Sequence, residues 1–299
     1  MDLTLWPLVS QPWPDLCAAV ELVERLGWHG VMVEDHFMAD GGGFGAVSDP
    51  RFEVTSVLSA LAVATRSVRL APLVMSATYR HPAVVANWAA TVDHISGGRL
   101  ALGLGAGWQL NEHVQYGIQL GTPGERIDRL DEYCTVVRSL FEQSVTDFNG
   151  RYFELSNAWC EPKPLQARLP LLIGGKGDRM LQLVARHADQ WNMWAMPTVF
   201  SERSGVLDQS CEAIGRDPAT VRRSTQALVR LTDSESEARS FIDAAGGRAA
   251  FVGTAKQFAD LAAQWHDAGV DELVIPDWHL GTGAQRAESI EAITAALRE

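Results

Sequence analysis

A histidine stands beside two carboxylates in the segment Glu34-Asp35-His36-Phe37, which directly follows a buried apolar run. A histidine at the end of a strand can take up or release a proton near neutral pH. His36 is therefore the candidate catalytic residue, acting as a general acid or base. The alternative is that His36 only caps the loop or shapes a pocket.

Two glycine-rich segments follow apolar runs and lead toward helices, at Gly103–Gly107 and at Gly174–Asp178. Such turns let backbone N–H groups approach a phosphate, and a helix N-terminus favours negative charge. The second segment is the better candidate because Lys176 and Arg179 add positive charge. The alternative is that these glycines only serve tight turns. Neither segment matches GxxxxGK[ST], and Trp108 stands where GxGxxG requires glycine.

Aromatic and cationic side chains gather after other apolar runs. Tyr79, Arg80 and His81 crowd one short loop, where they could bind an anionic or planar ligand, or where Arg80 could anchor the loop to a carboxylate. Tryptophans at strand ends suit a planar, conjugated ligand, although ordinary barrel packing would also place them there. These tryptophans are Trp108, Trp191, Trp194 and Trp278.

Composition excludes several classes of protein. A formal net charge of −12 argues against nucleic acid. No apolar run reaches the roughly 18 residues that a membrane span needs, and the N-terminus does not resemble a signal peptide. The four cysteines form no CxxC pair, which favours a reducing cytoplasm over a disulfide framework. No HExxH pair or GxSxG elbow is present, so we expect no metal and no serine nucleophile.

The elements that must position these residues are alternating strands and amphipathic helices. Eight β-rich runs are each followed by a helix, and the runs are near-continuous apolar stretches, as in buried parallel sheets. The predicted strands are 3–9, 30–35, 68–75, 99–107, 169–175, 189–194, 222–231 and 271–277. The pattern favours a single (β/α)₈ TIM barrel over residues 1–299, rather than an open α/β sheet with a small second domain.

An insertion interrupts the alternation after strand four, at about residues 108–168. It contains a predicted helix at 122–142 and a β-hairpin around Asn149-Gly150. Because barrel enzymes place their sites at the carboxyl ends of the strands, all the candidates above should meet at one mouth. Loops 38–52, 108–122 and 276–284 would then determine substrate specificity.

The same residues carry a family resemblance. TYRHPAVVANWAATVDHISGGRLALGLGAGW (78–108) resembles the core signature of luciferase-like monooxygenases and related deazaflavin-dependent oxidoreductases. EDHF (34–37), FNGRYFEL (148–155) and LLIGGKGDRMLQLVARHADQWN (171–192) follow the same family in the same order. The resemblance implies a barrel with an insertion, a flavin-type cofactor across its mouth, and a homodimer.

The resemblance also implies roles for individual residues. A bulge containing a non-prolyl cis peptide should fall within Leu73, Val74, Met75 and Ser76 and support the cofactor ring. The phosphate of the cofactor would lie on Gly174, Gly175, Lys176, Gly177 and Asp178, and near Ala106 and Gly107. Asp35 and His36 match residues beside the redox-active face, and Trp108 and Asn111 match cofactor-contacting positions. Sugar-phosphate dehydrogenases of the family carry an acidic residue where this chain has Trp108.

These expectations converge on an enzyme that moves a hydride between coenzyme F420 and a small organic substrate. The nearest alternative is a monooxygenase that uses reduced FMN and dioxygen. A barrel that binds a flavin without turnover is an alternative of another class. A cofactor-free aldolase or hydrolase comes last, because Lys176 is the only lysine in the strand-end loops and its glycine-rich surroundings suit phosphate better.

Overall fold

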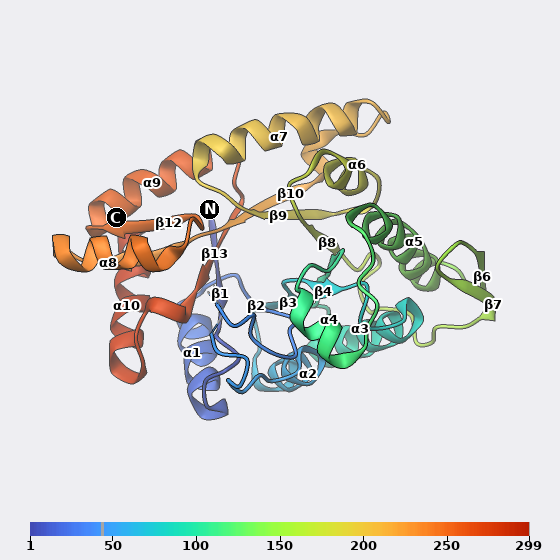
Figure 1. Ribbon diagram of the computed structural model, residues 1–299, viewed down its shortest axis with the longest axis horizontal. Coiled ribbons are helices and arrows are strands. Elements are labelled where there is room, and N and C mark those ends of the chain that lie inside the picture. Colours follow the sequence, from blue (N-terminus) through green and yellow to red (C-terminus); the bar gives the residue numbers. More distant parts are fainter. Residues whose placement is uncertain (43–44, 299) are drawn as a thin grey trace.

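Parallel strands form a barrel that helices surround (Figure 1). The structure is a computed structural model that describes residues 1–42 and 45–298. One sheet runs in the order β3-β2-β1-β13-β10-β9-β8-β5-β4. Its strands are β1 (Asp2–Trp6), β2 (Gly30–Val33), β3 (Arg69–Pro72), β4 (Met75–Ser76), β5 (Leu102–Gly105), β8 (Leu171–Gly174), β9 (Gln190–Trp194), β10 (Arg222–Gln226) and β13 (Glu272–Pro276).

The third strand of the barrel consists of two segments. β3 pairs with β2, and β4 pairs with β5, all in parallel. Between them the Leu73-Val74 peptide bond is cis, within the stretch where the family resemblance places such a bond. A parallel bridge between Leu70 and Leu100 joins β3 to the chain entering β5. The barrel therefore has the eight strand positions that the sequence predicts, which confirms the predicted fold.

Eight helices form the outer ring. They are α1 (Trp13–Arg25), α2 (Val54–Ala64), α3 (Pro82–Ser96), α5 (Pro123–Glu142), α6 (Asp178–His187), α7 (Pro197–Glu212), α9 (Ala255–Asp267) and α10 (Gly283–Ala296). α5 begins with a capping box between Thr122 and Glu125, which satisfies two of its terminal N–H groups. Because α5 packs against both α3 and α6, it is the fourth helix of the ring, although the sequence suggests an inserted helix.

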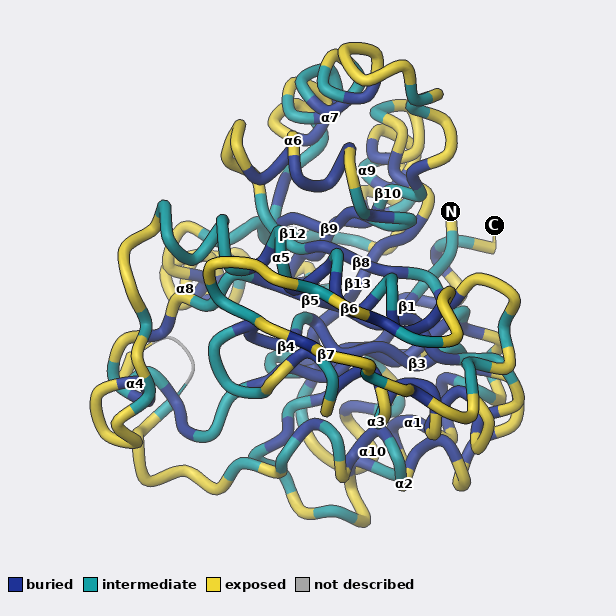
Figure 2. Tube along the Cα trace, turned by 90° about the vertical axis from the view of Figure 1, so that its right-hand side faces the viewer, coloured by how far each residue is buried: buried dark blue, intermediate teal, exposed yellow. Residues whose placement is uncertain are grey.

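Several segments lie outside the ring. After β5 come α4 (Leu110–Tyr116) and the antiparallel hairpin β6 (Thr146–Asn149) and β7 (Glu154–Ala158). The hairpin runs along the outside of the barrel with many exposed residues (Figure 2). Asn149 pairs with Glu154, so residues 150–153 form the turn. The predicted hairpin is confirmed, with a longer turn than a two-residue Asn-Gly connection.

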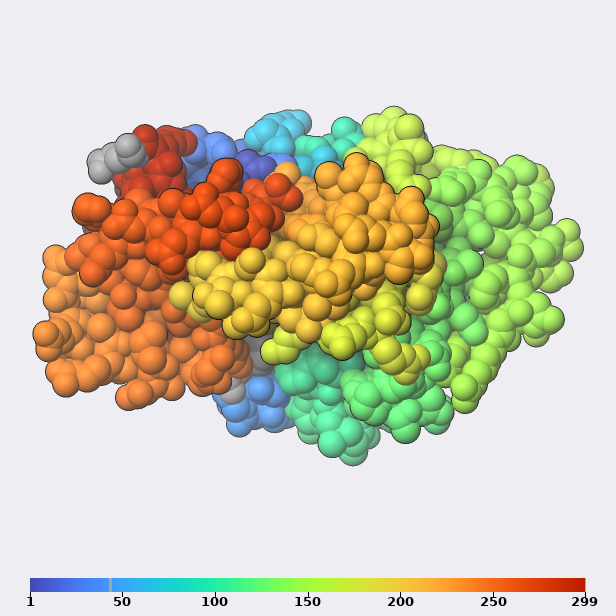
Figure 3. Space-filling model, turned by 90° about the horizontal axis from the view of Figure 1, so that it is seen from above, coloured from blue at the N-terminus to red at the C-terminus, as the bar shows by residue number. Residues whose placement is uncertain are grey.

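The predicted seventh strand, 222–231, is wrong in one respect, because the run divides at Ala227. β10 stays in the barrel, whereas β11 (Leu228–Leu231) pairs with β12 (Ala250–Gly253), a strand the sequence analysis missed. α8 (Glu235–Ala245) connects them, and two short 3₁₀ turns are Pro218–Thr220 and Asp277–His279. Seen from above, these C-terminal segments cover one end of the molecule and the insertion covers the other (Figure 3).

Glycines of β5 allow the third strand to approach closely. A Cβ atom at Gly103 would lie 1.9 Å from the carbonyl oxygen of Pro72, and one at Gly105 would lie 2.5 Å from Cγ2 of Val74. The first contact involves backbone, which cannot turn aside as a flexible side chain can. The glycines of strand four therefore have a packing role beside the cis peptide, whether or not they also contact a phosphate.

We expect Gly103→Ala to lower the free energy of unfolding by about 2–3 kcal/mol or more, because the added methyl overpacks a backbone contact. Urea denaturation followed by circular dichroism would measure the change. The matched control is Gly205→Ala, since a Cβ atom at Gly205 in α7 meets nothing within 4 Å. This control should be neutral or slightly stabilising. Equal stability of the two variants would contradict the packing role.

Candidate active site

A cavity of about 650 Å³ opens at the carboxyl ends of the barrel strands. Its walls come from the ends of β1, β2, β4, β5, β8, β9 and β10 and from a loop between α8 and β12. This volume lies in the ordinary range for pockets that enclose cofactors and small molecules. The location agrees with the rule by which the sequence analysis chose its candidates.

Most of the residues singled out from the sequence meet in this cavity. Those that line it are Asp35, His36, Leu73, Val74, Ser76, Tyr79, Gly105, Ala106, Gly107, Trp108, Gly174, Gly175, Lys176 and Trp194. They come from five strand ends that are far apart in the chain, so the barrel brings them together.

Four other candidates are not in the lining, namely Met75, Asn111, Gly177 and Asp178. Met75 is buried in the core between the strands and the helices. Nδ2 of Asn111 donates to the carbonyl oxygen of Ala39 at 2.7 Å, which ties α4 to the loop after β2. Gly177 is the N-cap residue of α6, and Asp178 forms an exposed ion pair with Arg203. Their cofactor contacts stay predictions.

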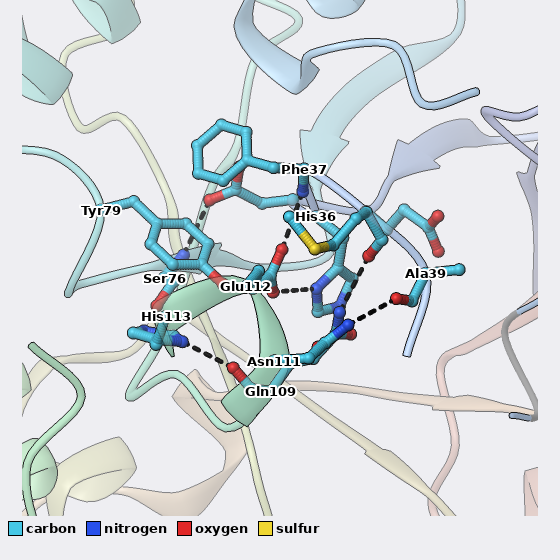
Figure 4. Close-up of polar contacts among 12 residues, drawn as sticks. His36, Phe37, Ala39, Ser76, Tyr79, Gln109, Asn111, Glu112 and His113 are labelled. Atoms are coloured by element: carbon cyan, nitrogen blue, oxygen red, sulfur yellow. Dashed lines mark hydrogen bonds and ion pairs between the residues drawn. The ribbon is translucent and has the colours of Figure 1, made fainter. Parts of the chain in front are cut away.

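His36 forms a dyad with Glu112, a residue of α4 that the sequence analysis missed (Figure 4). Nδ1 of His36 lies 2.7 Å from Oε1 of Glu112, whose side chain is fully buried. The Phe37 backbone N–H donates to Oε2 of Glu112 at 2.8 Å, and the Tyr79 hydroxyl donates to Oε1. Glu112 thus accepts three hydrogen bonds and fixes the ring of His36 at the cavity wall.

These contacts keep Glu112 ionised. Burial alone would raise its pKa, but the hydrogen bonds from His36, Tyr79 and the Phe37 backbone outweigh burial and lower the pKa below its ordinary value. Burial and the bond to Glu112 raise the pKa of Tyr79, so its hydroxyl remains a donor. A carboxylate is only an acceptor, so Nδ1 of His36 carries a hydrogen.

Asp35 connects two loops at the mouth of the barrel. Its Oδ2 accepts from the Ser76 backbone N–H at 3.0 Å, and both of its oxygens accept from Nη1 of Arg80 at 2.8–2.9 Å. Nη2 of Arg80 pairs with Glu53 at 2.6 Å. Burial raises the pKa of Asp35, opposed by the charge of Arg80. The sequence left open whether Arg80 binds a ligand or anchors its loop to a carboxylate, and the structure shows that it anchors the loop to Asp35.

The loop after β8 has the features of an anion site. Gly174 and Gly175 line the cavity without side chains, and Gly175 has a φ of +143°, where a Cβ atom would meet Met180 at 2.7 Å. Lys176 is exposed at the rim and makes no ion pair or hydrogen bond with the part of the chain that the structure describes. Open backbone and a cation beside the first turn of α6 fit a phosphate.

Aromatic rings form another part of the cavity wall. Trp6 and Trp194 line the cavity with ring centroids 5.8 Å apart, and Trp278 packs edge-on against Trp6 at 4.8 Å. Trp191, one of the tryptophans noted in the sequence, is instead buried outside the barrel, where it stacks on Phe200.

Sequence reasoning missed three parts of the wall. Trp6 ends the first strand, and the strand-end rule could have found it. Gln226 ends β10, but the predicted strand ran on to residue 231 and hid that end. No sequence signal marks residues 246–249, because they reach the cavity through the unpredicted β11–β12 pair.

Two further properties concern the described residues 1–42 and 45–298. Their His, Cys, Asp and Glu side chains form no group of three or more that could hold a metal ion. None of their helices is both long and apolar enough to cross a membrane.

A cavity at the carboxyl ends of the strands, lined by glycine backbone, a lysine, a histidine and tryptophan rings, is the arrangement expected of TIM-barrel enzymes. The chain belongs to the luciferase-like monooxygenase family, whose model matches residues 2–296.

Curated relatives share a third or less of their residues with the chain. An uncharacterized protein of Mycobacterium tuberculosis is 33% identical over 161 residues, covering 54% of this chain and 56% of the relative. The pyrimidine monooxygenase RutA of Acinetobacter baylyi is 30% identical over 252 residues, covering 78% of this chain and 65% of RutA. The chain thus spans between about half and two thirds of the length of these relatives.

Solved structures share the fold at low identity. An F420-dependent secondary alcohol dehydrogenase superposes with a TM-score of 0.84 at 18% identity, covering 98% of each chain. EDTA monooxygenase from Chelativorans sp. BNC1 superposes with a TM-score of 0.84 at 14% identity, covering 100% of this chain and 93% of the other. The fold thus occurs with an F420-dependent protein and with a monooxygenase.

We expect Glu112→Gln to cost about 2–3 kcal/mol of stability at neutral pH, because a buried carboxylate loses charge-assisted hydrogen bonds. The folded pKa of Glu112 lies below its unfolded value of about 4.3, so its contribution is complete above that pH and is lost as the pH falls through the folded pKa. Urea denaturation at several pH values should therefore show the gap between wild type and variant closing below about pH 4.

The control is Glu142→Gln, because Glu142 forms only surface ion pairs with Arg138 and Arg168. Its effect should be close to zero at every pH. A gap for Glu112→Gln that stays constant from pH 7 to pH 3 would show that the charge of Glu112 is not what stabilises the dyad.

Proposed function

We propose that this protein is an oxidoreductase that transfers a hydride between coenzyme F420 and a small organic substrate, as a homodimer. The observation that carries the proposal is that one cavity connects the Gly174–Lys176 loop, the segment around the Leu73-Val74 cis peptide, and His36. These are the three places where a phosphate, a planar ring and a proton-transferring group would be needed.

The residues fit the shape of a deazaflavin. Gly105 and Gly174 leave space that the side chain of Val74 enters, so Leu73, Val74 and Ser76 form a support for one face of a flat ring. Lys176 and the backbone of Gly174 and Gly175 would hold the phosphate. When bound, the cofactor supplies the carbon that accepts or returns the hydride, and the protein supplies placement and exclusion of water.

His36 moves the proton that accompanies the hydride. If the substrate is an alcohol, its hydroxyl proton goes to His36 as the hydride leaves carbon, and the reverse reaction returns the proton. Glu112 acts as a positioning residue, because it holds Nδ1 of His36 and leaves the ring edge-on to Trp108, with 5.4 Å between centroids.

The second candidate is a monooxygenase that uses reduced FMN and dioxygen. The similarity to RutA, which extends over 252 residues, favours it. FMN shares the tricyclic ring, the ribityl chain and the phosphate of F420, so the cavity would hold it on the same residues.

Fluorescence titration with F420 and with FMN separates the two candidates. We expect F420 to bind at micromolar concentration and more tightly than FMN. Lys176→Ala should weaken binding of the preferred cofactor about 10-fold, because one charge-assisted contact to phosphate is lost. Lys256→Ala, an exposed lysine of α9, is the control and should leave binding unchanged. Tight binding of FMN alone would contradict the first candidate and favour the second, and retention of neither cofactor would contradict both.

Turnover tests the role of His36. With a substrate found by screening small alcohols, aldehydes, enones and unsaturated lactams, His36→Ala should lower kcat by about 10²–10⁴-fold. The dissociation constant of the cofactor should stay nearly unchanged, as absorbance of the deazaflavin and fluorescence titration would report. His266→Ala on the surface of α9 is the control. Full turnover by His36→Ala would remove this residue from the mechanism, and absence of any hydride transfer would favour a non-catalytic flavin-binding protein.

A further inference from the structure

The aromatic wall contains an amide that is buried without a protein partner. Gln226 is 5% exposed and lines the cavity, and its side chain makes no hydrogen bond with the described residues. Its neighbours in β10 differ, since Ser224 donates to the carbonyl oxygen of Trp191 and Thr225 to that of Met193. A buried amide without a partner costs about 1–3 kcal/mol. An unpartnered amide in a residue that lines a cavity is typical of a ligand contact.

Trp6 has the same property. Its Nε1 atom is buried and has no partner within residues 1–42 and 45–298, and its ring lines the cavity. Other tryptophans of this protein donate their indole N–H, namely Trp28, Trp88, Trp191 and Trp265. Trp6 is therefore a second residue of the cavity lining with a buried donor that has no partner among the described residues.

The register of the strands places these groups on one side of the mouth. Gln226 pairs directly with Trp194 of β9 and with Val274 of β13. Trp6 pairs with Pro276, two residues further along β13. Because paired residues of parallel strands point to the same side, Gln226 lies beside the Trp194 ring, and the Trp6 ring contacts Trp194 in turn. We call Trp6, Trp194 and Gln226 the amide pocket.

We propose that the amide pocket is the substrate site and that it selects a planar ring containing a secondary amide, that is, a lactam. This inference rests on the proposed function, which assigns the Gly174–Lys176 side of the cavity to the cofactor. The primary amide of Gln226 offers one donor and one acceptor in a plane, and the N–H and C=O of a cis lactam match both. The lactam oxygen has a second lone pair for the indole N–H of Trp6.

The chemistry of the pocket disfavours other ligand classes. An ester or ketone has no N–H for Gln226, and a hydrocarbon leaves both buried groups unsatisfied. None of the three residues is charged, and the cation Arg248 lines the same cavity, so an ammonium group would be buried there without an opposite charge from them. Indole faces favour a flat ring over a branched aliphatic one.

Isothermal titration calorimetry with two probes tests the amide pocket. 2-Pyridone carries the lactam group, and N-methyl-2-pyridone has the same ring with the N–H blocked. We expect the wild-type protein to bind 2-pyridone at least about 10-fold more tightly, with cofactor present or absent. Gln226→Leu should abolish this discrimination, and Trp6→Phe should weaken 2-pyridone binding several-fold.

Matched controls are Gln264→Leu and Trp159→Phe, which alter exposed residues of the same types. Both should bind the probes as wild type does. Thermal unfolding checks the variants for folding, and Gln226→Leu should be as stable as wild type or more so, because an unsatisfied buried amide is replaced by an apolar group.

Equal affinity of wild type for the two probes, no binding of either, or unchanged discrimination by Gln226→Leu would overturn the amide pocket. These results are separate from the test of the proposed function. If the protein binds F420 but not 2-pyridone, only the proposal of the amide pocket is contradicted. If the protein discriminates the probes but retains neither cofactor, the proposed redox function is contradicted and the amide pocket is supported.

Discussion

The mouth of the barrel depends on the buried carboxylate of Asp35. This one group accepts from the backbone of Ser76 in β4 and from Arg80, and Arg80 in turn reaches Glu53 at the start of α2. Strand ends two and three, the loop before α3 and the start of α2 are thereby joined through two ion pairs that share Arg80. A buried charge of this kind is tolerated only because its partners surround it, and removal of a single partner would leave the others uncompensated. Asp35 thereby fixes the backbone of Ser76, two residues after the Leu73-Val74 peptide bond that lines the cavity.

Glycine residues of β5 and β8 also determine how closely the third strand packs at the mouth. Gly103 and Gly105 of β5 and Gly174 of β8 all lie against Pro72 or Val74, so the third strand fits against its neighbours where any larger residue would collide or crowd it. The same absence of side chains leaves backbone open at the cavity wall. Close packing of strands and access of a ligand to the backbone therefore both require glycine at these positions. For this reason the glycine-rich segments of the sequence did not show whether they serve tight turns or bind phosphate.

Much of the fold could be predicted, because parallel barrel strands are short apolar runs and their helices are amphipathic. The strand-end rule then placed His36, Trp108 and Lys176 correctly at the cavity. It failed where tertiary pairing overrides local pattern: residues 222–231 form one continuous β-rich run, yet β11 leaves the barrel at Ala227 to pair with β12. The link between His36 and Glu112 was also beyond prediction, since it joins residues 76 apart through the docking of α4.

The segment formed by β11, α8 and β12 affects how the entrance of the cavity can vary between related proteins. It supplies residues 246–249 to the rim, while Val229 of β11 and Phe251 of β12 pack with the main hydrophobic core. Changes in the turn at residues 246–249 would therefore reshape the entrance, whereas the apolar residues of β11 and β12 must keep their packing. New chemical preferences can thus arise by variation in one short turn, and protein engineers can vary the same turn for that purpose.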